Sequence, residues 1–256
     1  QPETTESAHR FLVQCGYWQA NHNPWPRRLG IDLDTLAIGI PALADEPRRD
    51  LTGLEAWAID DAGNQDPDDA ISVEGDRLWV HVADVAAVAV PDGDLDAEAR
   101  VRGANLYLPE KVVNMLPEAV TQRLGLGLHE ISPALSLGFR YPGGDVVEDI
   151  EIVPSWVRVQ RLSYDEAELR LDEEPFRSLF ELTGTFRQQR HAQDAASIEL
   201  PEVSVKVEIG EVRIHWPHAA CPGHGVVPEL AGSVADRRQG PQARDDHASS
   251  VAHLRN

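Results

Sequence analysis

Four of the five aspartates in residues 60–69 constrain this chain more than any other feature of its sequence, the fifth being Asp61. The four are Asp60, Asp66, Asp68 and Asp69. Carboxylates this close together repel one another, and they keep a fixed place in a fold mainly when a cation neutralises them. Mg²⁺ is the natural cation, because it prefers oxygen ligands and retains waters that substrate phosphates can replace. The cluster therefore predicts a metal site, with a solvated acidic loop as the alternative that the charge count alone favours.

A calcium-binding EF-hand does not fit the same residues. Counted from Asn64, the sixth position is Asp69 where the loop needs glycine, and the twelfth is Gly75 where it needs glutamate. Residues 70–73 and 78–83 alternate apolar and polar positions around a polar turn, which is typical of a β-hairpin. The acidic segment is thus expected to run into a strand, whereas an EF-hand loop runs into a helix.

The overall composition limits how the chain could work. Its 256 residues are 42 % hydrophobic, enough for one large domain with an appendage or for two small ones. The net charge of -20 argues against a broad basic surface, so binding of RNA would need metal ions and a local channel. The two cysteines, Cys15 and Cys221, lack histidines at zinc spacing. With no signal-peptide pattern and no membrane-spanning run, a soluble cytoplasmic protein is expected.

Apolar periodicity and turn residues predict an α+β fold, with a mixed, mainly antiparallel sheet and helices. Strands are expected in hairpins over 70–83, over 135–153 with an extension at 156–162, and over 198–214. Helices are expected over 8–21, over 95–102 with an aspartate cap and a glycine stop, at a capping box formed by Ser163 and Glu166, and over 176–195.

The spacing Asp-x5-Asp-x-Asp-Asp resembles the metal-binding signature of the ribonuclease II family. Further segments match the family in the same order, namely 78–85, 95–100, 106–109, 115–117 and 162–166. Several ordered matches are far more specific than an acidic loop alone. The resemblance implies a partial RNB-type catalytic domain over 55–215, preceded by a helix and linker over 1–54 and followed by an irregular tail over 216–256.

This resemblance implies an enzyme, a hydrolytic 3′-to-5′ exoribonuclease that uses Mg²⁺ and releases 5′-nucleoside monophosphates from single-stranded RNA. By the same analogy, Asp60 and Asp69 are direct metal ligands, and Asp66 supports the site directly or through water. Asp68 is the residue expected to be most costly to lose. The spacing does not reveal which aspartate would bridge two metal ions.

Two tyrosines, a histidine and a further aspartate also have expected roles. Tyr107 and Tyr164 match the family's aromatic positions near the terminal nucleotides, where a ring can stack on any base. The alternative is that both are ordinary half-buried tyrosines at strand ends. His81 alternates with core valines and is expected to pack in the core, while Asp84 is expected to brace the metal loop.

The resemblance stops near residue 214. The family's second half, with its Thr-Ser-Pro-Ile-Arg segment, and its basic S1-type module have no counterpart in this sequence. We therefore expect a truncated chain, out of frame or disordered from about His215, monomeric, and weak in nuclease activity by itself. A catalytically inactive RNA-binding or interaction module of the same fold is the alternative function.

Overall fold

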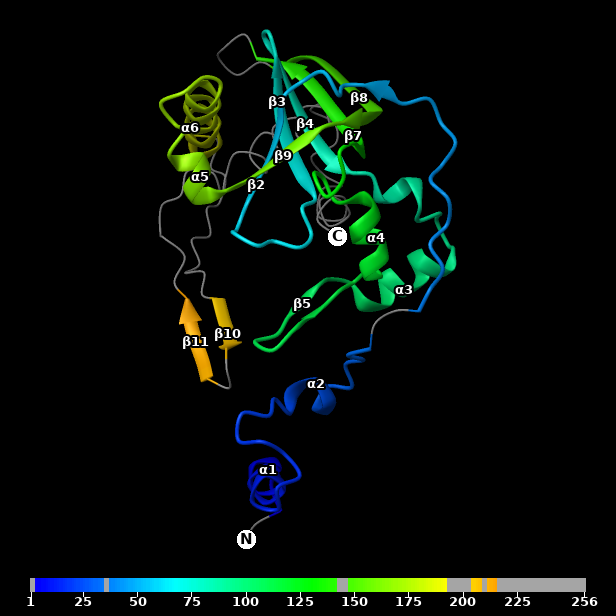
Figure 1. The fold of residues 1–256 in the computed structure, drawn as a ribbon, viewed down its shortest axis with the longest axis vertical. Coiled ribbons are helices and arrows are strands. Elements are labelled where there is room, and N and C mark those ends of the chain that lie inside the picture. Colours follow the sequence, from blue (N-terminus) through cyan, green and yellow to red (C-terminus); the bar gives the residue numbers. More distant parts are fainter. Residues whose placement is uncertain (1–2, 35–36, 142–146, 193–203, 209–210, 216–256) are drawn as a thin grey trace.

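The computed structural model of the protein describes residues 3–34, 37–141, 147–192, 204–208 and 211–215 (Figure 1). Its helices are α1 (Thr5–Gln14), α2 (Trp25–Arg28), the short 3-10 helix η1 (Val85–Ala87), α3 (Asp94–Arg102), α4 (Glu118–Leu124), α5 (Tyr164–Glu168) and α6 (Phe176–Ala192). Its strands are β1 (Arg49–Asp50), β2 (Ala56–Asp60), β3 (Asp69–Glu74), β4 (Arg77–Ala83), β5 (Leu106–Tyr107), β6 (Val112–Val113), β7 (Ser132–Arg140), β8 (Glu148–Val157), β9 (Val159–Ser163), β10 (Ser204–Glu208) and β11 (Glu211–His215).

Seven strands form the central sheet, in the order β1-β8-β7-β4-β3-β2-β9. Its inner pairs are antiparallel, while β1 with β8 and β2 with β9 are parallel pairs at the two edges. Helix α5 contacts β9 and β2, and α4 contacts β7 (Figure 1). The predicted α+β fold with a mixed, mainly antiparallel sheet is confirmed.

The β3–β4 hairpin follows its sequence pattern. Glu74 pairs with Arg77, and Gly75 between them has a φ of +63°, which glycine adopts without strain. This short turn fixes the register of the whole hairpin. At the opposite end of the hairpin, Asp69 pairs with Val82, so the first residue of β3 marks where the acidic loop joins the sheet.

Strand β2 reaches the acidic loop differently. It pairs with β3 only at Ala56 and Trp57, and it then stays beside β9 as far as Asp60, which pairs with Ser163. The strands β2 and β3 therefore separate before the loop begins. The aspartates lie where the sheet opens, between β9 on one side and the start of β3 on the other.

A row of polar side chains crosses the buried middle of the sheet. His81 on β4 bonds to Ser72 on β3 (2.9 Å) and to Ser136 on β7 (2.7 Å). Ser136 in turn bonds to Ser155 on β8 (2.5 Å), and none of these residues is accessible to solvent. Burial lowers the pKa of His81 to about 4, so its ring is neutral at pH 7. The prediction that His81 packs in the core is confirmed.

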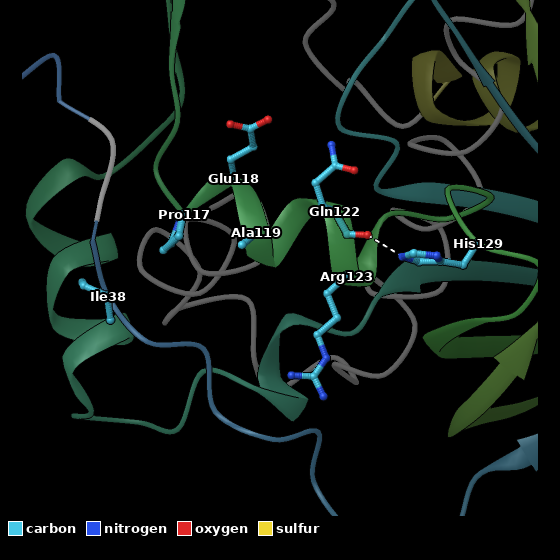
Figure 2. Close-up of a pocket in the computed structure, with 7 residues that line it drawn as sticks. All are labelled: Ile38, Pro117, Glu118, Ala119, Gln122, Arg123 and His129. Carbon is cyan, nitrogen blue, oxygen red and sulfur yellow. Dashed lines mark hydrogen bonds between the residues drawn. The ribbon is translucent and has the colours of Figure 1, made fainter.

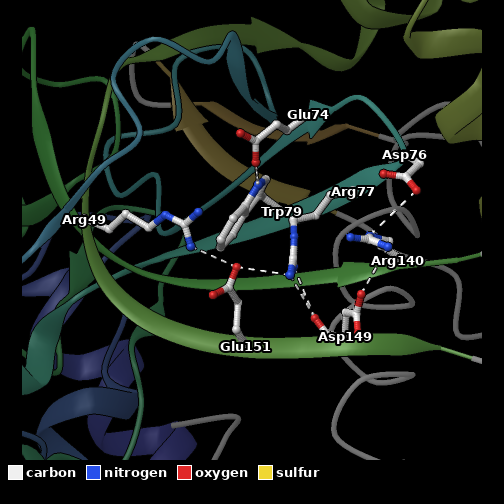
Figure 3. A network of polar contacts seen from close by, with 8 residues as sticks. All are labelled: Arg49, Glu74, Asp76, Arg77, Trp79, Arg140, Asp149 and Glu151. Atoms are coloured by element: carbon white, nitrogen blue, oxygen red, sulfur yellow. Dashed lines mark hydrogen bonds and ion pairs between the residues drawn. The ribbon is translucent and has the colours of Figure 1, made fainter.

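Trp79, also on β4, lies buried within a network of ion pairs (Figure 3). The guanidinium carbons of Arg49 and Arg77 lie 5.1 and 5.3 Å from the centre of its ring. Its indole nitrogen donates to Glu74 (3.0 Å), and Glu151 pairs with both arginines (2.9 and 3.1 Å). Because these residues come from β1, β3, β4 and β8, the network holds the edge strand β1 to the sheet.

Gly138 on β7 lies opposite Trp79 in the antiparallel ladder. A Cβ atom at this position would lie 2.6 Å from the indole ring, which the arginines hold in place. We therefore expect Gly138→Ala to lower the free energy of unfolding by about 1–3 kcal/mol, the usual cost of overpacking a filled site. Urea unfolding measures this change. Gly53→Ala is the control, since a Cβ there meets nothing within 4 Å, and equal effects of the two substitutions would contradict the prediction.

The N-terminal segment departs from its prediction. The helix expected over 8–21 is the shorter α1, which begins at a capping box between Thr4 and Ser7 and ends before Gly16, a glycine with a φ of +71°. The segment expected to be a linker contains α2 and the sheet strand β1. Long-range pairing with β8 makes a strand of two residues that carry no strand pattern of their own.

Other local signals give a mixed result. Helix α3 ends at Gly103 (φ +76°) as predicted, but its N-cap is Gly93 without a side-chain bond, so the predicted aspartate cap is wrong. Asp96 instead accepts from the backbone N–H of Asp92 (2.7 Å). The capping box that begins at Ser163 is confirmed. The turn of the hairpin predicted over 135–153, the predictions for residues 193–203 and the tail over 216–256 lie outside the described residues.

Candidate functional site

The acidic loop is fixed to the fold mainly through its second half. Asp60 ends β2 and Asp69 begins β3, with Asp66 and Asp68 between them. Two backbone bonds hold this half, since the N–H of Leu126 donates to the carbonyl of Pro67 (2.9 Å) and that of Ala83 donates to the carbonyl of Asp68 (2.8 Å). Pro67 is buried. Segments that are distant in sequence therefore place the carboxylates of residues 66–69.

Asn64 organises the first half of the loop. Its side-chain amide donates to the carboxylate of Asp60, and its side-chain oxygen accepts from the backbone N–H of Asp66 (2.9 Å). Its backbone carbonyl accepts a bond from Arg161 on β9. Sequence reasoning missed both Asn64 and Arg161, because an amide inside an acidic loop and an arginine 97 residues away carry no shared pattern.

Asp66 is held from the other side by the segment that leads into β5. Asn105 donates to its carboxylate (3.0 Å), and the hydroxyl of Tyr107 donates to the same oxygen (3.4 Å). The backbone N–H of Met115 donates to the side-chain oxygen of Asn105 (2.7 Å), which orients the amide. The structure therefore brings Tyr107 to the acidic loop, with 67 % of the residue still exposed to solvent.

Tyr164 lies beside the other end of the cluster. It follows Ser163, which pairs with Asp60 in the parallel β2–β9 ladder, and it starts α5 as a half-buried residue. The two candidate tyrosines thus flank the acidic loop, Tyr107 near Asp66 and Tyr164 near Asp60.

Three carboxyl groups of the acidic loop have raised pKa values. Burial is the main cause in each case, and neighbouring carboxylates add to it. The pKa of Asp69 rises to about 7, with Asp68 and Asp60 adding to the effect of burial. The pKa values of Asp68 and Asp66 are also raised, and Asp60 contributes to both. Asp68 keeps contact with solvent, so water screens its charge more than that of the half-buried Asp69.

The side chains of the acidic loop are of the kind that binds a hard cation, but in this structure they are not arranged around one. Carboxylate and amide oxygens are the ligands that Mg²⁺ prefers, and a cation would relieve the repulsion that raises the pKa values. Among the described residues, however, no group of three or more His, Cys, Asp or Glu side chains is arranged so that it could hold a metal ion. The loop therefore gathers the four aspartates without converging them on one point.

A pocket of about 440 Å³ opens beside the acidic loop. Asp60, Asn64 and Pro67 contribute to its loop wall, and Arg161 and Ser163 contribute to its β9 wall. Its volume falls in the range of small-molecule sites. A group of nucleotide size can thus lie next to Asp60.

A larger pocket of about 570 Å³ lies at α4, away from the acidic loop (Figure 2). Its polar groups are engaged within the protein, since Arg123 donates to the carbonyl of Pro41 (2.7 Å) and His129 bonds to the carbonyl of Gln122 (2.8 Å). Glu118 is its only carboxylate. Size alone does not identify the site, and the chemistry points to the smaller pocket.

Asp84 does not brace the acidic loop with its side chain, contrary to expectation. Its carboxylate accepts from Arg48 (2.7 Å), and the two side chains are only 7 % and 1 % exposed. The neighbouring residue Ala83 supports the loop instead, through its backbone bond to Asp68.

The raised pKa of Asp69 predicts a pH-dependent stability difference. The folded-state pKa of about 7 exceeds the ordinary value of 3.8, so the contribution of Asp69 to stability is fully present below pH 3.8 and is lost as the pH rises through 7. At pH 8 without divalent cations, Asp69→Asn should unfold with a free energy about 2–4 kcal/mol higher than the parent chain, and this advantage should shrink towards pH 4. Urea unfolding at both pH values measures it. A variant less stable than the parent at pH 8 would contradict the shift, and Asp61→Asn controls for the loss of one charge.

Comparison with known proteins identifies the family. The family model of the RNB domain matches residues 48–224, more than half of the chain. The chain belongs to the RNB family. The match begins just before β1 and extends past residue 215, into the segment for which the sequence suggested an irregular or out-of-frame tail. An uncharacterised ribonuclease of Synechocystis is 33 % identical to this RNB chain, over 93 % of the chain and 39 % of the relative.

Solved structures show the same fold at low sequence identity. Exoribonuclease Dss1 of Candida glabrata, as an active-site mutant, matches with a TM-score of 0.71 at 20 % identity, over 90 % of this chain and 36 % of that one. Mycoplasma genitalium RNase R, in complex with ribose-methylated single-stranded RNA, matches with a TM-score of 0.64 at 19 % identity, over 78 % and 34 %. The chain thus spans well under half the length of these proteins.

Activity does not follow from this fold alone. Yeast Ssd1, described as a pseudonuclease, matches with a TM-score of 0.58 at 19 % identity, over 89 % of this chain and 30 % of that one. The residues of the acidic loop must therefore carry the functional argument. Among the described residues, no helix combines the length and apolar character needed to cross a bilayer.

Proposed function

We propose that this chain is part of a 3′-to-5′ exoribonuclease that hydrolyses single-stranded RNA to 5′-nucleoside monophosphates with Mg²⁺. The observation that carries the proposal is the crowded acidic loop of an RNB-family chain. In it, burial and neighbouring carboxylates together raise the pKa values of Asp66, Asp68 and Asp69. Such a cluster of carboxylates destabilises the fold when no cation is bound. Its presence therefore favours a function in which the loop binds a cation.

Asp60, Asp66, Asp68 and Asp69 would hold the metal. When bound, Mg²⁺ activates water and stabilises the leaving 3′-oxygen of a phosphodiester. The side-chain amide of Asn64 donates to the carboxylate of Asp60 and would lie beside a metal ion held there. Arg161 donates to the backbone carbonyl of Asn64 and so helps to fix this side of the loop.

The tyrosines would position the RNA end. Tyr107 exposes its ring while its hydroxyl stays on Asp66, and such a ring can stack on any base. Tyr164 lies beside the pocket next to Asp60. The net charge of -20 fits a protein that contacts RNA at a local site rather than over a broad surface, and we propose a monomer that acts in the cytoplasm.

A direct assay tests this function. A single-stranded RNA labelled at its 5′ end is incubated with the chain, and with a version extended by its downstream coding sequence, in Mg²⁺ or in EDTA. We expect shortening from the 3′ end and release of 5′-nucleoside monophosphates in Mg²⁺ only, more strongly for the extended version. Binding of RNA without any release by either version would instead favour an inactive RNA-binding module.

A further inference from the structure

Residues 7–31, which we term the N-terminal arm, differ in charge from the rest of the chain. The arm contains Arg10, Arg27 and Arg28 and no aspartate or glutamate, whereas the whole chain has 43 acidic and 23 basic residues. A polyanion is repelled by most of this protein but not by the arm. Phosphate groups could pair with Arg10 and Arg27 without an opposing carboxylate in the same segment, whereas Arg28 also interacts with Glu6, just ahead of the arm in α1.

The arm also exposes aromatic rings. Phe11, Tyr17 and Trp25 are 62 %, 68 % and 59 % exposed, and α1 has no buried residue. Single exposed apolar residues are ordinary, but three large rings within one short acid-free segment form a stacking surface. Stacking on rings is independent of base identity, which suits a nuclease without sequence preference.

Contacts within the arm and with Thr5, just ahead of it, order parts of this segment. Trp18 stacks on His22, with ring centres 4.3 Å apart. Arg28 donates to the carbonyl of Thr5 (2.9 Å), which ties α2 to α1, and its guanidinium carbon lies 5.2 Å from the centre of the Trp25 ring. An arginine and an exposed aromatic ring thus lie side by side in the arm, at Arg28 and Trp25.

The arm is joined to the acidic loop by the β5–β6 hairpin. Asn23 donates to Glu110 (3.4 Å), and Lys111 donates to the carbonyl of Leu33 (2.6 Å), both in the turn of that hairpin. Tyr107 on β5 of the same hairpin reaches Asp66. Figure 1 shows α1 and α2 continuing beyond this hairpin, away from the central sheet. The order along the surface is thus the acidic loop, Tyr107 and then the arm.

We propose that the N-terminal arm is a second binding site for single-stranded RNA, which holds nucleotides upstream of the 3′ end while that end lies at the acidic loop. The proposal rests on the proposed function, because it uses the same RNA strand. Phe11, Tyr17 and Trp25 stack on bases, and Arg10, Arg27 and Arg28 pair with phosphates. Long strands then gain affinity from the arm, and short strands do not reach it.

The test compares two lengths of RNA. Fluorescein-labelled oligouridylates of about 16 and about 4 nucleotides are titrated by fluorescence anisotropy in Mg²⁺, with Asp68→Asn present in every chain to prevent degradation. Tyr17→Ala/Trp25→Ala should raise the Kd of the long strand by about tenfold or more and change that of the short strand by less than about twofold. Leu169→Ala/Val101→Ala is the matched control, because both residues are exposed apolar residues outside the arm (85 % and 82 %).

Salt provides a second readout. Arg27→Ala/Arg28→Ala should reduce the slope of log Kd against log salt for the long strand by about 1.4, because each phosphate of a single strand that an arginine neutralises contributes about 0.7 to that slope. An unchanged Kd for the long strand, an equal loss in the control, or no measurable binding of the long strand overturns the proposal. If the arm instead binds a protein, the Kd of the long strand will be unchanged. Release of monophosphates by the parent chain tests the proposed function separately, so the two failures are distinguishable.

Discussion

Asp68→Asn is expected to lower the rate of Mg²⁺-dependent nucleotide release by about 100-fold or more, whereas Asp76→Asn should leave it within about twofold. Asp68 lies among the carboxylates of the acidic loop, and its pKa is raised by burial and by Asp66 and Asp60. Replacing it removes a charge that a bound cation would neutralise. Asp76 lies in the turn at the opposite end of the same β3–β4 hairpin, with its side chain 81 % exposed, so it controls for loss of one carboxylate.

The fold of the Asp68→Asn variant must be intact for this result to bear on chemistry. Its backbone carbonyl still accepts from Ala83, and removal of one like charge relieves repulsion, so unfolding without Mg²⁺ should occur at no lower urea concentration than in the parent. Rates are measured on the extended chain if the 256-residue chain is too slow. A variant that keeps more than about a tenth of the parent's rate would refute the role given to Asp68.

Two local signals in the sequence predicted the structure correctly. The β3–β4 hairpin and the capping box at Ser163 depend on residues a few positions apart, and both form as expected. The parallel edge pairs β1–β8 and β2–β9 join segments about 100 residues apart, and no local pattern encodes them. The opening between β2 and β3 depends on the pairing of β2 with β9. The sequence therefore predicted that the aspartates lie in a loop, but not where that loop lies in the sheet.

For the site as well, some residues could be predicted from the sequence and others could not. The spacing of the four aspartates is visible in the sequence, and so is Tyr107 through the family resemblance. The residues that hold them are not, because Asn105 and Arg161 act on the loop from 39 and 97 residues away. Asp84 shows the opposite error. It follows the acidic loop and β4 closely in sequence and was expected to brace the loop, but its side chain is paired with Arg48 in the fold.

Arg48→Met is expected to lower the free energy of unfolding by about 3–5 kcal/mol, because it leaves Asp84 buried without a cation. Arg48 donates to both Asp84 and Glu46 (2.7 Å each), and its side chain is 1 % exposed. Its guanidinium carbon also lies 5.4 Å from the centre of the Trp156 ring on β8. Methionine retains part of the packing but supplies none of these polar contacts.

A double-mutant cycle separates the ion pair from the packing. Arg48→Met/Asp84→Asn should recover much of the stability lost in Arg48→Met, since the second change removes the unpaired charge. The exposed pair of Arg158 and Glu130, at 3.3 Å with side chains 57 % and 79 % exposed, is the matched control, and Arg158→Met should cost less than about 1 kcal/mol. Urea unfolding measures these three variants and Asp84→Asn alone, which completes the cycle. If Arg48→Met costs no more than Arg158→Met, the buried pair does not hold the start of β1 in place, and the Trp79 network alone must fix that edge of the sheet.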